Sequence, residues 1–323
     1  MRRACRIASS DIFVGQPREQ AASDATRTHL FGGLIAAQAV VAASRTVPPA
    51  HRIHSLHSHF ILAGDGRKPI VFQVTRTRDG GSMTTRQVAV TQDNEVIFLM
   101  TASFHKDEPG PEFQRPPEEL ASILNTLMPA HGGGDTFHTA QSLLDSGKKP
   151  ELGGNPPWSP DTGSLDLFSG LNHSLAWRRH LSTVADTDED GEPVEGSWCM
   201  HAALLAFMSD EGLLSTVRQP YGGTAISMST SLDHTIHFHR RFRSDEWLLF
   251  HNETTVSSGA RGVARTEVFD ERGILVASFM QEGLVRPPRG WEPEEHQEAQ
   301  LERIAAETQH VLQLQTKPEG AKL

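Results

Sequence analysis

The sequence predicts an α+β protein made of the same unit twice, each unit being one helix packed against an antiparallel sheet. An apolar helical segment followed by short strand-like segments occurs before residue 107 and again after residue 197. The halves also share short sequences, because Ala102-Ser103-Phe104 recurs as Ala277-Ser278-Phe279 and an arginine, Arg86 or Arg261, precedes each at the same distance. Such self-similarity indicates internal duplication. One helix wrapped by one curved sheet buries the apolar surfaces of both.

The first unit begins with a helix at Leu34–Ala43, which is apolar on nearly all sides, as expected of a helix buried all round. Strands follow, since short runs with β-branched and aromatic residues are separated by hairpin signals at Asp79-Gly80-Gly81 and Asp93-Asn94. The expected strands are His51–Leu62, Pro69–Arg78, Met83–Gln92 and Val96–His105.

The second unit repeats this order. Trp198–Leu214 is again a largely apolar helix, and Asp270-Glu271-Arg272-Gly273 marks the last hairpin. The expected strands are Ser227–His239, Trp247–Ser257, Val263–Phe269 and Ile274–Val285.

A connector separates the two units. Nine of the 19 prolines fall between Pro109 and Pro160, so long regular elements are not expected there beyond a short helix near Glu118–Leu127. A further loop surrounds Asp186–Glu195, and the Glu- and Gln-rich stretch Glu294–Leu314 predicts a solvated helix. The expected organisation is a first unit at 1–106, a connector at 107–165, a second unit at 166–289 and a helical tail at 290–323.

Composition excludes several classes of protein. The chain carries 30 Lys and Arg against 40 Asp and Glu, a net charge of −10 that argues against a nucleic-acid partner. Two cysteines, Cys5 and Cys199, cannot form a disulfide framework or a Cys-rich zinc site. The most apolar run, Leu34–Ala43, is too short to span a membrane, and no secretory signal follows the N-terminal arginines. We expect a soluble intracellular protein without a membrane partner.

Common catalytic and metal motifs are missing. The sequence lacks G-x-S-x-G, the Walker A motif and G-x-G-x-x-G. The acidic run at 186–190 begins like a calcium loop, but Pro193 interrupts it and Ser197 stands where a bidentate Glu is needed. The histidine pairs His57/His59 and His237/His239 each share a strand face but lack a third ligand. We therefore expect no metal and no cofactor.

A few polar residues interrupt the apolar pattern of the second unit. Asp210 lies late in the expected helix, where a carboxylate must be paired, hydrogen-bonded or functional. Ser231 and Asp233 alternate on the next strand, and Gln281 lies late in the last one. Asp, Ser and Gln from a helix and two strands could converge on one water molecule. The pattern alone leaves open whether these residues are catalytic or only satisfy one another.

The chain resembles the type II acyl-CoA thioesterases, the TesB-like double-hotdog family that includes peroxisomal members. The resemblance covers most of residues 27–106 and 198–287. Its first half rests on Phe31-Gly32-Gly33, HSLHSHF at 54–60, Gly64-Asp65, Arg78-Asp79-Gly80 and MTASF at 100–104. Its second half rests on Ser209-Asp210, SLDHTIHFHRRF at 231–242, EWLLF at 246–250, Ala260-Arg261-Gly262, Val276-Ala277-Ser278 and Gln281-Glu282-Gly283.

The resemblance implies a double hotdog fold and hydrolysis of acyl-CoA to fatty acid and CoA. The family's catalytic Asp, Thr or Ser, and Gln fall on Asp210, Ser231 and Gln281, which would polarise a water without a covalent Ser intermediate. Asp210 would accept the proton of this water, while Ser231 and Gln281 would orient it. Backbone N–H groups near Gly32 and Gly33 are candidate donors to the oxyanion. His54 and Asp233 are expected in supporting or structural roles.

Three departures from the family pattern are visible. The leucine-rich helical segment before Phe31 is nearly missing, the regions 107–165 and 166–197 match poorly, and the tail beyond Arg289 is longer. The C-terminal Ala321-Lys322-Leu323 is similar to a peroxisomal address of the S-K-L type. It predicts the peroxisomal matrix for a eukaryotic source and the cytoplasm for a bacterial one.

Two other functions remain alternatives at this point. A hotdog enoyl-CoA hydratase would use an Asp/His pair, which Asp233-His234 could imitate, and a non-catalytic acyl-CoA-binding module would bind without turnover. A homo-oligomer, either a dimer or a tetramer, is expected because hotdog sheets commonly associate.

Overall fold

The computed structural model describes residues 10–15, 29–114, 162–169, 173–185, 196–218, 226–290, 302 and 305. The chain divides into two compact units, Met1–Arg286 and Pro287–Leu323. All named helices and strands belong to Met1–Arg286, which contains both of the repeats expected from the sequence. The short helix expected near 118–127, the loop at 186–195, most of the expected tail helix and the C-terminal tripeptide lie outside the described residues.

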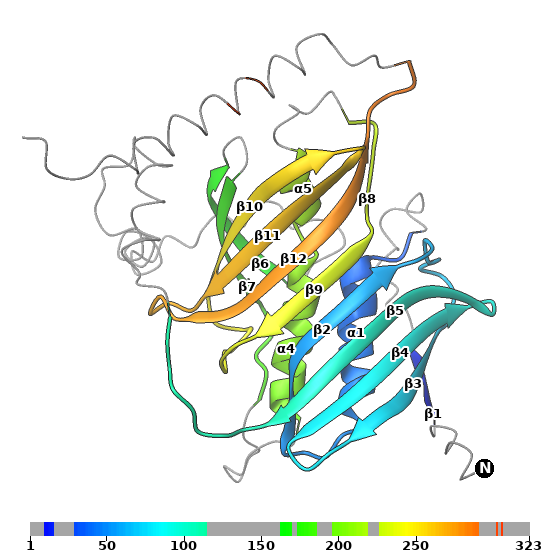
Figure 1. Ribbon diagram of the computed structural model, residues 1–323, viewed down its shortest axis with the longest axis vertical. Helices are drawn as coiled ribbons and strands as arrows, with labels where there is room; N and C mark the ends of the chain where they lie inside the picture. The colour runs from blue at the N-terminus through cyan, green and yellow to red at the C-terminus, as the bar shows by residue number, and fades with distance from the viewer. Residues whose placement is uncertain are drawn as a thin grey trace, which may run out of the picture. The chain divides into compact units, whose positions relative to one another are not determined.

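The described strands form one continuous antiparallel sheet (Figure 1). Their order across the sheet is β1-β3-β4-β5-β2-β9-β12-β11-β10-β7-β6, and β8 pairs with β12 beside this path. The first half supplies β1 (Ser10–Gly15), β2 (His51–Phe60), β3 (Ile70–Asp79), β4 (Met83–Gln92) and β5 (Glu95–Lys106). The second half supplies β6 (Thr162–Ser169), β7 (His173–His180), β8 (Met228–Ser231), β9 (Asp233–Phe238), β10 (Leu248–Ser258), β11 (Arg261–Phe269) and β12 (Leu275–Arg286).

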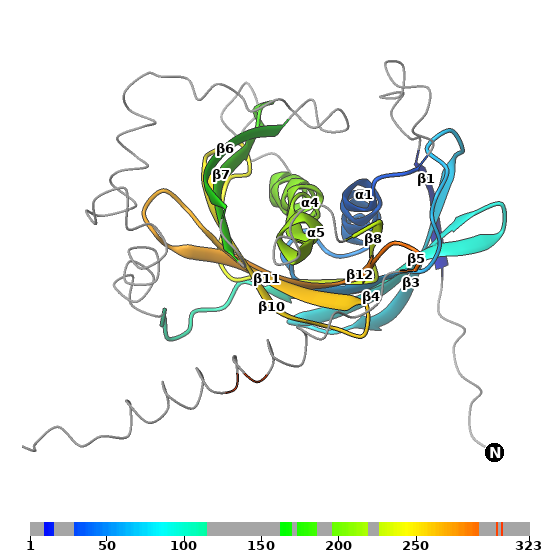
Figure 2. The ribbon, with the colours of Figure 1, turned by 90° about the horizontal axis from the view of Figure 1, so that it is seen from above.

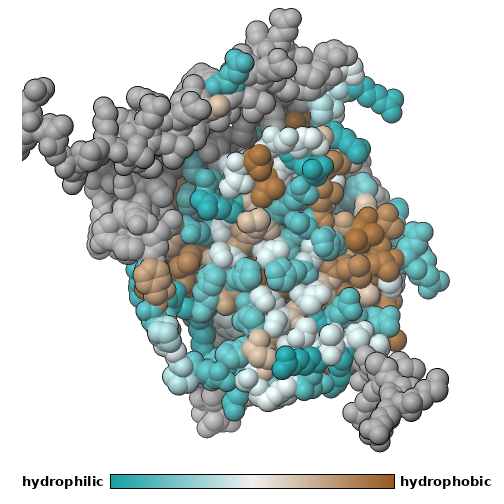
Figure 3. Space-filling view, in the orientation of Figure 1, coloured by the Kyte–Doolittle hydropathy of each residue, from teal (hydrophilic) through white to brown (hydrophobic). Residues whose placement is uncertain are grey.

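The helices α1 (Gly32–Ser44), α4 (Ser197–Ser209) and α5 (Leu213–Arg218) lie inside the curve of this sheet (Figure 2). Small residues such as Ala39 and Ala206 are fully buried where α1 and α4 pack together. Apolar residues of the helices and of the inner sheet face form one core cluster that spans both halves. The opposite sheet face shows mainly hydrophilic and neutral residues (Figure 3). The apolar composition of both helices is therefore explained by burial between the sheet and a neighbouring helix.

The two halves join at β2 and β9, which pair antiparallel with Ser55 opposite His237 and His59 opposite Asp233. The Ser58 hydroxyl adds a 2.9 Å hydrogen bond to the carbonyl of His234 across this seam. The expected repetition of a helix and a sheet is present, but the two expected sheets are joined into a single continuous sheet.

Arg86 and Arg261, which have the same spacing from the repeated Ala-Ser-Phe sequence, do not occupy equivalent positions in the structure. Arg86 lies opposite Ala102 in the β4–β5 pairing, is fully buried and pairs with Asp79. Arg261 lies opposite Leu284 in the β11–β12 pairing and pairs with Glu282 on the surface. The common spacing of the two arginines is therefore a coincidence and does not mark equivalent sites.

Several predicted elements were missed or have different bounds. β1, β6 and β7 were not predicted, and β6 begins at Thr162, inside the expected connector. The helix expected at Trp198–Leu214 is two helices, because the chain breaks at Asp210–Gly212 and Gly212 has a φ of +91°. The strand expected at Ser227–His239 is divided at Leu232 into β8 and β9.

Candidate active site

Asp210 lies directly after the last residue of α4, at its C-cap position, with φ −83° and ψ −7°. The prediction that it lies within a longer helix is wrong, because Gly212 adopts a left-handed conformation that ends the apolar run. The carboxylate consequently points out of a helix end that is anchored by buried Leu205, Ala206 and Met208. A rigid helix thus fixes its position.

Ser231 and Gln281 come from neighbouring strands. Ser231 is the last residue of β8, whose pairing with β12 places it opposite Gly283, two residues from Gln281. The Gln281 amide Nε2 donates to Asp210 Oδ1 at 2.8 Å and to Ser231 Oγ at 2.5 Å. The Ser231 hydroxyl donates to the same Asp210 oxygen at 3.4 Å. The three side chains that the sequence singled out therefore form one hydrogen-bonded cluster.

The first half of the chain contributes the other side of this cluster. The backbone N–H of Gly33, at the start of α1, donates to Asp210 Oδ2 at 2.8 Å. Gly32 packs so closely that a Cβ atom there would lie 2.6 Å from the Phe60 ring and 2.8 Å from Asp210 Oδ2. An N-terminal helix amide favours a negative charge. Gly33 was expected to face the oxyanion, but its N–H instead holds the carboxylate of Asp210.

The protonation state of Asp210 follows from its surroundings. Burial raises the pKa of its carboxyl to about 6, although hydrogen bonds from Gln281, Gly33 and Ser231 act in the opposite direction. Gln281 is 1% exposed, and its Oε1 is buried without a hydrogen-bond partner among the described residues. The cluster thus combines a carboxylate that can exchange a proton near neutral pH with an unused acceptor beside it.

Similarity to known proteins identifies the family of this chain. A family model described as acyl-CoA thioesterase matches residues 170–284, and one described as its N-terminal domain matches residues 21–105. Human acyl-coenzyme A thioesterase 8 is 31% identical over 269 residues, covering 80% of this chain and 80% of that protein. The chain belongs to the acyl-CoA thioesterase II family.

Other relatives of this thioesterase include bacterial proteins. Acyl-CoA thioesterase 2 of Haemophilus influenzae is 29% identical over 80% of this chain and 87% of its own length. The crystal structure of an acyl-CoA thioesterase II from Mycobacterium marinum aligns with a TM-score of 0.65 and 31% identity, covering 89% of this chain and 98% of that one. A hot dog protein from Alicyclobacillus acidocaldarius aligns with a TM-score of 0.58 at 16% identity, covering 86% and 94% of the respective chains. The expected double hotdog fold is confirmed, and the protein is a thioester hydrolase.

The residues expected in supporting roles lie outside the hydrogen-bonded cluster. Asp233 Oδ1 accepts the backbone N–H of Glu282 at 2.8 Å and so ties β9 to β12 beside Gln281. His54 Nε2 contacts Ser103 Oγ at 2.8 Å, and its ring packs on His105. Burial, with His105 and His237 nearby, lowers the pKa of His54. These contacts give Asp233 and His54 structural roles.

His234, which the sequence offered only as half of a hydratase-like pair with Asp233, lies next to the site. It is fully buried, its Nε2 contacts Ser209 Oγ at 2.7 Å, and burial lowers its pKa to about 3. It therefore stays neutral and braces the residue before Asp210. The Asp233 carboxylate accepts the backbone N–H of Glu282 and makes no hydrogen bond to His234, so the Asp/His pair of a hydratase is not formed by these two described residues.

The paired histidines expected to share strand faces do so at the seam. His57, His59, His237 and His239 are all exposed on the outer sheet face, and the rings of His57 and His237 lie 5.6 Å apart. Their polar contacts are hydroxyl groups, Thr235 for His57 and Ser278 for His239. Within the part of the chain that the structure describes, no three His, Cys, Asp or Glu side chains are grouped as metal ligands, and no helix is long and apolar enough to cross a membrane.

Proposed function

We propose that this protein hydrolyses acyl-CoA thioesters with a water molecule activated by Asp210 and oriented by Ser231 and Gln281. The observation that carries this proposal is that Ser231 at the end of β8 and Gln281 in β12 contact each other and both donate hydrogen bonds to the carboxylate of Asp210, which directly follows α4. Membership of the acyl-CoA thioesterase II family supports the substrate class.

Asp210 is suited to act as the general base. Its pKa of about 6 means that the carboxylate predominates at neutral pH while remaining basic enough to accept a proton. The water would donate one hydrogen to Asp210 and the other to the unused Gln281 Oε1. Ser231 accepts a hydrogen bond from Gln281 and donates to Asp210, so both side chains restrict the position of the attacking oxygen.

In the proposed reaction the water oxygen bonds to the thioester carbonyl carbon as its proton passes to Asp210. The tetrahedral intermediate then breaks its C–S bond, the carbonyl re-forms, and the proton on Asp210 passes to the departing CoA sulfur. The products are a fatty acid and CoA, and the balance requires only water and substrate, without a cofactor. We assign the oxyanion to the N–H of Gly32, because the N–H of Gly33 already binds Asp210.

Thiol release from a panel of acyl-CoAs of increasing chain length tests this function. We expect Asp210→Asn to lower kcat by about 10²–10⁴-fold, since it removes the base, and Gln281→Ala to lower it by about 10²-fold. Asp93→Asn is the matched control, because Asp93 lies in the exposed β4–β5 turn and Asn tolerates its φ of +51°. Unchanged kcat in both site variants would refute the mechanism.

The same panel separates the alternatives. Hydration of crotonyl-CoA without thiol release would identify a hydratase, and binding of acyl-CoA without any turnover would identify a binding module. Release of thiol by the wild type excludes the binding module.

Two finer proposals concern assembly and location. We propose a homo-oligomer that forms through the sheet edge, where Ile12 and Val14 of β1 are 68% and 64% exposed. Light scattering after size-exclusion chromatography measures its mass. In a eukaryotic source, Ala321-Lys322-Leu323 would direct the protein to the peroxisomal matrix, which deletion of the tripeptide in a fluorescent fusion tests.

A further inference from the structure

Phe60 lies beside the candidate active site, although the proposed mechanism does not use it. A Cβ atom at Gly32 would lie 2.6 Å from Phe60 Cε1 and 2.8 Å from Asp210 Oδ2, so the ring edge and the carboxylate border the same space. The backbone N–H of Phe60 donates at 2.9 Å to the carbonyl of Leu232, the residue after Ser231. The end of β2 is thereby fixed against the second half of the site.

The Phe60 ring is only partly buried. It packs on Phe98, which is fully buried, with the two ring centroids 5.3 Å apart, so its position is fixed from the core side. Gly32 and Asp210 are partly exposed as well. Because these three neighbouring residues all keep some accessible surface, a ligand that reaches the carboxylate can also touch the ring.

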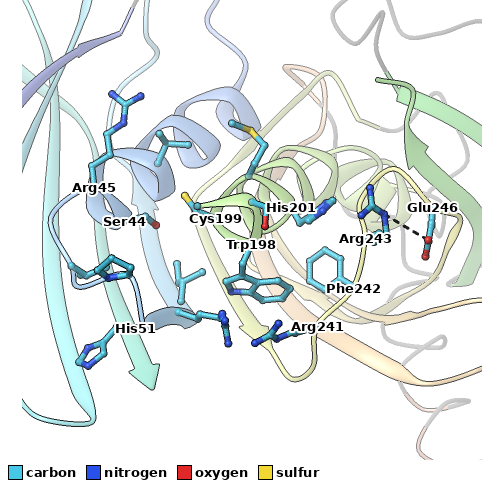
Figure 4. A pocket seen from close by; sticks show the side chains of 18 of the residues that line it. Ser44, Arg45, His51, Trp198, Cys199, His201, Arg241, Phe242, Arg243 and Glu246 are labelled. Carbon is cyan, nitrogen blue, oxygen red and sulfur yellow. Dashed lines mark ion pairs between the residues drawn. The ribbon is translucent and has the colours of Figure 1, made fainter. Parts of the chain in front are cut away.

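The opposite end of the helix pair contains the counterpart of Phe60. β2 ends at Phe60 and β9 ends at Phe238, and these two strands pair antiparallel at the seam. The Trp198 indole packs edge-on against Phe238, with ring centroids 6.4 Å apart, and Phe238 is buried. Figure 4 shows this end, where Trp198 lies beside Phe242 and where Arg45 follows α1. The phenylalanine of the second half is therefore covered.

The first residues of the two helices explain this difference. α1 and α4 each have 13 residues, but α1 begins with Gly32 and Gly33, whereas α4 begins with Ser197 and Trp198. Because glycine has no side chain, the start of α1 leaves Phe60 uncovered. Of the two counterpart rings, the one at the candidate active site is therefore the accessible one.

Apolar residues follow Phe60 directly in the chain. Ile61 and Leu62 are half-exposed, and their N–H groups donate to the carbonyl of Ile97 at 2.9 Å and 3.2 Å. Val96, which precedes Ile97, is exposed as well. Because none of these side chains carries a charge or a hydrogen-bonding group, the surface beside the ring suits a hydrocarbon chain.

We propose that Phe60 packs against the first carbons of the acyl chain and so selects against a branch at the α-carbon. This inference deepens the proposed function and rests on it. The carbonyl carbon must lie about 3 Å from the water bound to Asp210, and its oxygen is assigned to the N–H of Gly32. Of the two groups bonded to that carbon, the sulfur leads to the amide-bearing arm of CoA and the α-carbon begins the hydrocarbon. The apolar ring beside Gly32 and Asp210 therefore suits the α-carbon.

Thiol release from two substrates tests this role: the straight-chain acyl-CoA that the wild type hydrolyses best, and its 2-methyl derivative. We expect the wild type to prefer the straight chain in kcat/KM by about 10-fold or more, because one methyl group that a site cannot accommodate costs at least this factor. Phe60→Ala should reduce the preference to about 2-fold, and Phe60→Leu should give an intermediate value. The preference is a ratio of two rates from one preparation, so it is unaffected by partial loss of folded enzyme.

Phe238→Ala is the matched control. It removes the same ring from the counterpart position, about 20 Å from Asp210 along α4. Because Phe238 is buried and packs on Trp198, this variant should lose at least as much stability as Phe60→Ala and yet keep the wild-type preference. A change of preference in both variants would attribute the effect to destabilisation and overturn the proposal.

Other results would also refute the role of Phe60. An unchanged preference in Phe60→Ala would exclude contact between the ring and the α-carbon. A loss of kcat/KM that is equal for both substrates would show that the ring only supports the site or contacts the arm of CoA. A wild type that hydrolyses both substrates equally well would show that no side chain restricts the α-carbon. Failure of the proposed function would appear separately, as a wild type that releases no thiol from any acyl-CoA.

Discussion

Asp210 is the residue whose protonation governs the proposed chemistry. Its folded-state pKa of about 6 lies above the ordinary 3.8, so it is protonated and inactive as a base below pH 6 and ionised above it. We predict that kcat/KM for acyl-CoA rises with pH through an apparent pKa near 6. Initial thiol-release rates from pH 4.5 to 8 measure this limb. A profile that is flat over this range would contradict the assignment of Asp210 as the base.

The raised pKa of Asp210 also affects the free energy of unfolding, which should fall as pH rises, whereas activity should increase. Because folding raises the pKa of Asp210, the protonated form favours the folded state, and that contribution is lost as pH rises from about 4 through 6. The Asp210→Asn variant lacks this titration, so denaturant titrations of both proteins at pH 4.5 and pH 7 provide the control. The unfolding free energy of the wild type should fall, relative to the variant, between the two pH values.

Gly32 is confined by the residues that it touches. A methyl group at this position would lie 2.8 Å from Asp210 Oδ2 and 2.6 Å from the Phe60 ring, closer than real Cβ contacts. We predict that Gly32→Ala displaces the carboxylate and lowers kcat by about 10-fold or more, because small misplacements of reacting groups are costly. Stopped assays of thiol release check this value. Gly81→Ala, where a Cβ meets open space, should retain wild-type kcat.

The sequence predicted Asp210, Ser231 and Gln281 as candidate site residues because each interrupts an apolar pattern and matches a family motif. The partnership of Gly33 with Asp210 could not be predicted, since it joins residues 177 positions apart through a backbone atom. The sequence offered His234 only as half of a pair with Asp233; its contact with Ser209 could not be predicted, because it depends on burial between residues that are distant in the sequence.

The break between α4 and α5 is the element that presents Asp210. Gly212 adopts φ +91°, and Arg178 supports the break by donating to the carbonyl of Glu211 at 2.6 Å. We predict that Gly212→Ala costs about 1–2 kcal/mol and lowers kcat, because a left-handed conformation is unfavourable for alanine. Thermal unfolding and thiol release measure the two effects.

A matched substitution separates strain from function. Gly259 has φ +58° in the β10–β11 turn, away from Asp210, so Gly259→Ala should destabilise the fold by a similar amount without changing kcat. Equal kcat in both variants would show that the α4–α5 break does not position Asp210.

Element prediction succeeded where periodicity and turn residues agreed, as for β4, whose bounds match the expectation. It failed at Trp198–Leu214, because apolar composition continues across the break and only Gly212 marks it. β7 was missed because it lies beyond a proline-rich stretch, although its central residues Leu175 and Trp177 are fully buried. Its strand character comes from pairing with β10, which the local sequence does not reveal.

The molecule as a whole has one sheet and one core, although its sequence reads as two copies. The β2–β9 pairing and the contact of α1 with α4 join the two halves around one shared hydrophobic core. We predict that Met1–Arg286 unfolds in a single cooperative transition. Differential scanning calorimetry should give equal calorimetric and van't Hoff enthalpies, and two separate transitions would disprove this coupling.

Duplication within one chain permits an asymmetry that two identical subunits could not have. In a symmetric pair of identical units, the residue after each helix would be the same at both ends of the helix pair. Here Asp210 stands at one end and Arg45 at the other, so the ends have acquired opposite chemistry. Under the proposed mechanism, covalent linkage has released one of two equivalent positions from catalysis, and each half can change without altering its copy.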